Sequence, residues 1–151
     1  MKESLEKARE ELKRSDHLIY VSLKYTRTCD VFKSIIERLI NAMDFMIEAL
    51  LKKEAEDNNI EEIPPQPIAK CKLCADTTGN DEIKEMCDFF LTLKKISRAG
   101  FTREREYRRH VTMRMDIEGT ECSVDIDTIT EYYKRTQHYY DMIQALLTGD
   151  E

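Results

Sequence analysis

Apolar residues recur along most of this chain at the three- and four-residue spacing of an amphipathic α-helix. The pattern covers residues 4–24, 31–55, 81–98 and 128–147, and charged residues fill most of the intervening positions. It is strongest at residues 31–55, where the apolar face is wide enough to be buried on more than one side. These segments predict a mostly α-helical protein, a four-helix-type antiparallel bundle.

Polar residues suited to helix caps lie between the predicted helices. Thr28 or Asp30 can cap the second helix, whereas one continuous helix through residues 26–30 is an alternative because no Gly or Pro enforces a break. Asn80 is a suitable cap for the third helix and Asp127 for the last. The capping pattern therefore places the helix starts but leaves the first boundary open.

Two segments depart from the helical period. Residues 57–80 contain Pro64-Pro65-Gln66-Pro67, which predicts an extended connector. Between residues 110 and 126 apolar and polar positions alternate on both sides of Glu118-Gly119, as in two strands joined by a tight turn. We therefore expect a β-hairpin before the last helix, with its apolar face on the bundle, since an isolated hairpin is only marginally stable.

The composition is typical of one packed domain spanning residues 1–151. Of these residues 41% are hydrophobic and 36% are charged. The chain opens on charged residues without the apolar region of a secretion signal, and it contains no apolar run long enough for a membrane span. The five cysteines are an odd number, which favours reduced thiols. We expect a cytoplasmic protein that does not associate with membranes.

Positive charge is concentrated in one part of this acidic chain, whose net charge is −6. Residues 94–114 contain eight Lys or Arg against two Glu, so this segment carries +6 and the remainder −12. Arg103, Arg108 and Arg109 are suited to binding RNA phosphates, and Tyr107 between them could stack on an unpaired base. The alternative is that the interleaved Glu residues, or acidic groups on the helices, pair with these arginines.

Within the same run, Arg105 and His110 form an Arg-x4-His spacing, and here the chain resembles the HEPN superfamily of small helical bundles. The resemblance covers this motif and the two long helices ahead of it. In HEPN ribonucleases the Arg and the His lie at a helix start and cooperate in metal-independent RNA cleavage. The resemblance therefore implies Arg105 as a phosphate stabiliser and His110 as a general base, roles that a guanidinium and a neutral imidazole can perform.

A broader resemblance covers most of the chain. The segment at residues 15–26, the connector beginning Ile63-Pro64-Pro65 and the hairpin before a tyrosine-rich final helix are similar to small archaeal proteins that are functionally uncharacterised. This resemblance implies a helical fold in an archaeal cytosol and brings no activity with it.

A cysteine pair in the connector is a candidate metal site. Cys71 and Cys74 have the spacing with which two thiolates bind zinc, and Cys87, Cys122 or His110 could complete a tetrahedral site. A second Cys-x-x-Cys or a close His pair is missing, however. The pattern therefore favours ordinary thiols, and we expect neither a metal nor a cofactor.

Tyrosines on the last predicted helix suggest a seam or a partner surface, because a tyrosine ring buries apolar area while its hydroxyl stays in water. They are Tyr132, Tyr133, Tyr139 and Tyr140. With the wide apolar face of residues 31–55, they predict a non-enzymatic protein that acts by association, as a homodimer or with another protein. The alternative is a HEPN-like RNA-binding protein or metal-independent ribonuclease that uses Arg105 and His110.

Overall fold

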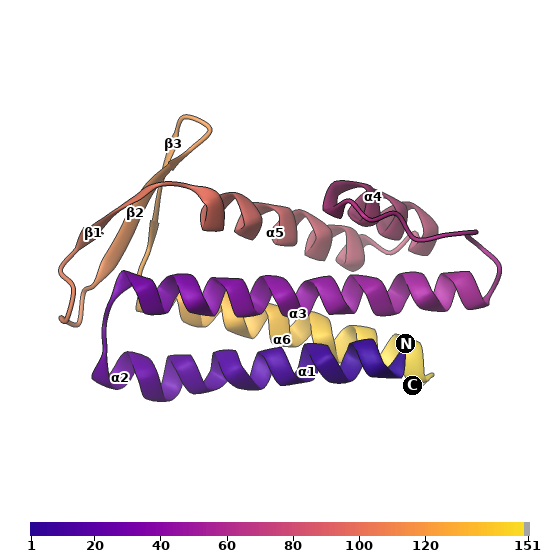
Figure 1. Cartoon of the computed structure of the whole chain (residues 1–151), viewed down its shortest axis with the longest axis horizontal. Coiled ribbons are helices and arrows are strands. Elements are labelled where there is room, and N and C mark those ends of the chain that lie inside the picture. Colours follow the sequence, from indigo (N-terminus) through magenta and orange to yellow (C-terminus); the bar gives the residue numbers. More distant parts are fainter. Residues whose placement is uncertain (150–151) are drawn as a thin grey trace.

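The computed structural model describes residues 1–149, in which five helices pack antiparallel and a three-stranded antiparallel sheet is inserted before the last helix (Figure 1). The predicted fold class is therefore confirmed. The first helical segment consists of α1 (Lys2–His17), one π-helical turn, η1 (Leu18–Ser22), and α2 (Leu23–Tyr25). The other helices are α3 (Cys29–Glu56), α4 (Pro67–Thr78), α5 (Asp81–Arg98) and α6 (Ile126–Thr148). None of these helices combines the length and apolar character of a membrane span.

The long helix α3 lies at the centre of the molecule and explains the wide apolar face seen in the sequence. It packs against α1 and α6 on one side and against α4 and α5 on the other (Figure 1). Phe32, Leu39 and Leu51 are among its fully buried residues. Each such side chain stabilises the fold by about 1.5–3 kcal/mol relative to an exposed position. The face of α3 is thus used within the chain itself.

The chain breaks between α2 and α3, so the alternative of one continuous helix is wrong. Thr28 has an extended backbone and its Oγ1 accepts a hydrogen bond from the Val31 N–H at 3.4 Å. A hydroxyl cap of this kind satisfies a free N–H of the first turn, so no Gly or Pro is needed. Asp30 is not the cap, because it lies inside the first turn of α3.

The sheet consists of β1 (Phe101–Glu104), β2 (Thr112–Ile117) and β3 (Thr120–Val124) in that order. The predicted hairpin is the β2–β3 pair, and its turn residues Glu118 and Gly119 both have positive φ, as a tight hairpin turn requires. The first strand, β1, was not predicted. It pairs antiparallel with β2 and leaves the loop at residues 105–111 projecting between them.

The predicted connector at 57–80 is wrong in its second half, because residues 67–78 form α4. Pro67 occupies the first turn of this helix, where a missing N–H costs nothing, and Gly79 ends it with φ of 59°. The cap of α6 also differs from the prediction. Asp125, not Asp127, accepts the hydrogen bond from the Thr128 N–H.

Candidate nucleic-acid interface

The loop at residues 105–111 joins β1 to β2 at the end of the bundle where α3 begins. Arg105 and Tyr107 both have left-handed backbones, with φ of 54° and 65°. Such a conformation costs a non-glycine residue about 1–3 kcal/mol, so surrounding contacts must hold it. One of these contacts is a 2.6 Å hydrogen bond from the Tyr107 N–H to the carbonyl of Arg27, and the buried Val111 fixes the far end of the loop.

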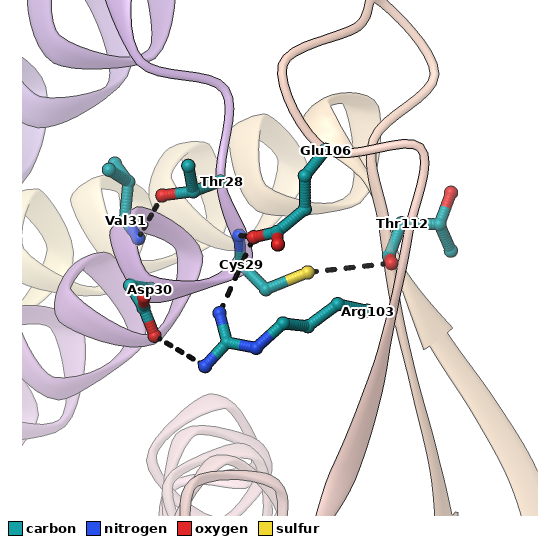
Figure 2. Close-up of polar contacts among 7 residues, drawn as sticks. All are labelled: Thr28, Cys29, Asp30, Val31, Arg103, Glu106 and Thr112. Carbon is teal, nitrogen blue, oxygen red and sulfur yellow. Dashed lines mark hydrogen bonds and ion pairs between the residues drawn. The ribbon is translucent and has the colours of Figure 1, made fainter.

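Glu106 anchors the loop to the first turn of α3 (Figure 2). Its Oε2 accepts a hydrogen bond from the Cys29 N–H at 2.9 Å and lies 3.4 Å from the Arg103 guanidinium. A carboxylate is favoured at a helix N-terminus, where the N–H groups lack helical partners and the helix dipole is positive. The side chain of Glu106 thus points inward, and only 24% of it is exposed.

Arg103 is also part of this anchor. Its guanidinium pairs with Asp30 at 2.9 Å, and that hydrogen bond lowers the pKa of the Asp30 carboxyl (Figure 2). Beside it the Cys29 thiol donates to the Thr112 carbonyl at 3.4 Å. Arg103 was predicted to bind phosphate, but the structure joins it to two carboxylates that tie β1 and the loop to α3.

The side chains of the three arginines of the loop itself have no partner among the residues that the structure describes. Glu104, the second acidic residue of the run, forms an ion pair with Arg114 on β2. Within residues 1–149, the guanidinium groups of Arg105, Arg108 and Arg109 have neither an ion pair nor a hydrogen bond. The two Glu residues of the run therefore neutralise the strand arginines and leave those of the loop open to solvent.

A surface pocket of about 460 Å³ brings three arginines and a histidine together. Arg105, Arg109 and His110 line it from the loop, and Arg27 lines it from the α2–α3 connection. We call these four residues the arginine pocket. Arg27 was not singled out in the sequence. Within residues 1–149 its guanidinium has no ion pair or hydrogen bond, and its Nε is buried.

The start of α6 closes the other side of the arginine pocket with two carboxylates, Asp125 and Asp127. The Asp125 carboxylate accepts bonds from the backbone N–H and the hydroxyl of Thr128, at 2.8 and 2.9 Å, and the backbone hydrogen bond lowers its pKa. Three guanidinium groups against two carboxylates leave a net positive charge. Because the Asp125 carboxylate already caps the N-terminus of α6, the arginines remain available to bind an external anion.

The structure thus brings the predicted pair Arg105 and His110 into one open pocket. It does so on a loop between two strands, whereas the HEPN resemblance implies a helix start. Arg108, predicted to bind nucleic acid with Arg109, is exposed on the same loop but does not line the pocket.

The tyrosines of α6 lie mainly inside the molecule. Tyr139 and Tyr140 are buried, and Tyr132 and Tyr133 are half-buried. The ring of Phe89 on α5 packs edge-on against Tyr132 and tilted against Tyr139. These four residues therefore form a seam of the bundle and present little ring surface to a partner.

The candidate metal ligands Cys71, Cys74 and Cys87 are buried where α4 meets α5. A hydrogen bond with Cys87, together with burial, raises the pKa of the Cys71 thiol. Across residues 1–149 there is no group of three or more His, Cys, Asp or Glu side chains that could hold a metal ion. These thiols act as small core residues of the α4–α5 contact.

No protein-family model, curated protein or solved structure matches this chain. The resemblances to HEPN and archaeal proteins stay predictions.

Proposed function

We propose that the protein binds RNA through its phosphates at the arginine pocket. The observation that carries the proposal is the placement of three guanidinium groups, unpaired within the described part of the chain, around one open cavity. Guanidinium groups bind phosphate oxygens through paired hydrogen bonds, and an unpaired cation at a surface is free to do so. The charge of the pocket and the absence of competing ion pairs within residues 1–149 favour a polyanion as the ligand.

Association through apolar surfaces has less support. The wide face of α3 is covered by α1, α4, α5 and α6, and the tyrosine seam is largely internal. A homodimer stays a prediction, and its most exposed tyrosines on α6 would be Tyr132 and Tyr133.

The test is a binding measurement with a fluorescent RNA strand, followed by fluorescence anisotropy at low salt. Arg105→Ala/Arg109→Ala removes two of the three pocket cations, and we expect at least a tenfold weaker Kd, since each phosphate contact of a charged group contributes about 1 kcal/mol or more. Lys2→Ala/Lys72→Ala is the matched control, because it removes two exposed cations on α1 and α4 that, like the pocket arginines, have no ion pair within residues 1–149. Equal loss in both variants, or no binding by the unaltered protein, would refute the proposal.

RNA cleavage is a second candidate function, favoured by His110 lining the same pocket as Arg105. In this reaction the His110 imidazole accepts the 2′-hydroxyl proton and the 2′-oxygen forms a bond to phosphorus. The bond to the 5′-oxygen then breaks, and that oxygen takes a proton from water, which leaves a 2′,3′-cyclic phosphate. Arg105 would stabilise the charge that develops on the phosphoryl oxygens.

Cleavage is tested by following RNA fragments in the presence of a chelator. We expect His110→Ala to abolish fragment formation while binding is retained, because the imidazole moves a proton and the arginines bind the phosphate. His17→Ala is a matched control on α1, away from the loop. Cleavage that survives in His110→Ala, or that the chelator stops, would exclude this mechanism.

A further inference from the structure

Tyr25 and Tyr107 are the two most exposed large hydrophobic side chains among residues 1–149, at 81% and 74% exposure. Each lies two residues from an arginine of the pocket, Tyr25 before Arg27 and Tyr107 after Arg105. The two segments meet directly, since the Tyr107 N–H donates to the Arg27 carbonyl at 2.6 Å. The two most exposed aromatic residues therefore lie on the two segments that supply the arginines of the pocket, outside its lining.

Four of the other five tyrosine rings have aromatic partners, and the fifth, Tyr140, is buried. Tyr20 packs edge-on against Tyr133, and Phe89 packs against Tyr132 and Tyr139. Within the described part of the chain, neither Tyr25 nor Tyr107 has a ring contact. Their apolar faces are left in water, where they are open to a flat ligand group.

We propose that the RNA bound at the arginine pocket is single-stranded, and that two of its bases stack on Tyr25 and Tyr107. This inference rests on the proposed function and names the class of RNA. Aromatic rings beside cations are the usual means by which proteins hold unpaired strands, because every base has a face that can stack. In a duplex the bases already stack on one another and are not open to these rings.

The experiment uses the full chain and an unstructured RNA of about 12 nucleotides, within the usual site size of single-strand binding. Its Kd is compared with that of the same strand annealed to its complement, and we expect the duplex to bind at least tenfold more weakly. Tyr25→Ala and Tyr107→Ala should each weaken single-strand binding roughly tenfold, and Tyr107→Phe should restore it because the ring is kept. Ile68→Ala is the control, a side chain of similar exposure, 71%, on α4.

The outcomes separate this inference from the proposed function. If the duplex binds as well as the single strand and the Tyr variants bind normally, while Arg105→Ala/Arg109→Ala still weakens binding, the stacking inference is wrong and the phosphate site stands. If the arginine variant also binds normally, both fail. Equal affinity for the same sequence as DNA would support stacking but overturn the restriction to RNA. Circular dichroism checks that each variant is folded, which we expect because both tyrosines are exposed.

Discussion

At the scale of single residues, the partners of two glutamate side chains decide which arginines are left to bind an external anion. Glu106 points inward to the Cys29 N–H and Arg103, and Glu104 pairs with Arg114. Both acidic residues of the basic run are thereby used at the strand and at the start of α3. The loop arginines are not neutralised, because their nearest acidic neighbours in sequence pair with other residues.

Glu106→Ala should destabilise the protein by about 2 kcal/mol, because it leaves the Cys29 N–H without its charged acceptor in a partly buried place. Glu104→Ala is the matched control. It removes a carboxylate whose partner is solvent-exposed, and we expect a clearly smaller loss of stability. Urea unfolding of both variants measures the difference. A loss for Glu106→Ala no larger than that for Glu104→Ala would contradict the anchoring role.

The same contacts show how far the site could be predicted from sequence. Arg105 and His110 were found because they lie close together in the chain, and they do share a pocket. Arg27 was missed because it lies far from the loop in sequence, and contacts made only in the fold, such as the Tyr107–Arg27 and Cys29–Glu106 hydrogen bonds, bring it there. The sequence could not show that Arg103, unlike the neighbouring arginines, is paired. Its partner Asp30 is distant in sequence and lies beside it only in the folded chain.

At the scale of elements, the strong apolar periodicity of the four long helical segments predicted them correctly. Helix α4 and strand β1 have no such periodicity and were not predicted. Helix α4 follows a proline-rich stretch, and its only buried side chains are Cys71 and Cys74, so nothing in the pattern marked an apolar face. Strand β1 is short and polar and is stabilised by pairing with β2, across the loop. Caps were predicted where a side-chain acceptor had one suitable position, as at Asn80, and misplaced where two aspartates compete, as at Asp125 and Asp127.

The start of α6 links stability to binding through Asp125. Asp125→Ala should cost about 1 kcal/mol because the Thr128 N–H loses its cap, whereas Asp125→Asn should keep most of the stability, since Asn caps equally well. Asp125→Asn also removes a negative charge from the arginine pocket, so it should bind RNA more tightly than the unaltered protein. Unchanged or weaker binding in a folded Asp125→Asn variant would contradict the proposed site.

The stabilisation by Asp125 should also depend on pH. Its pKa is lowered in the folded protein, chiefly by the Thr128 backbone hydrogen bond, from the ordinary value of 3.8. The unfolded chain therefore binds the proton more readily, so the stabilisation is present above about pH 4 and is lost as the pH falls through the lowered pKa. Unfolding free energies of the unaltered protein and Asp125→Ala should consequently converge in acid. A constant gap down to pH 2 would show that the carboxylate charge is not involved.

At the scale of the whole molecule, the arginine pocket is a small positive site on an acidic protein. The sheet and the loop lie at one end of the bundle, and the chain starts at the other end (Figure 1). Several cations of the basic run are neutralised there, including Lys95 by Glu118 at 2.8 Å and Arg114 by Glu104 and Glu121. The eight basic residues of the sequence are thus not one continuous phosphate-binding surface.

The salt dependence of RNA binding distinguishes a small arginine pocket from a continuous surface of eight basic residues. Each phosphate neutralised on a single strand contributes about −0.7 to the slope of log K against log salt concentration. Three pocket arginines therefore predict a slope of about −2, and Arg105→Ala/Arg109→Ala should reduce it to about −0.7. If all eight basic residues of the run contacted RNA, the slope would be about −6. A slope that steep would show that the ion pairs of the strand arginines open on binding, and a slope near zero would show that RNA is not held by its phosphates.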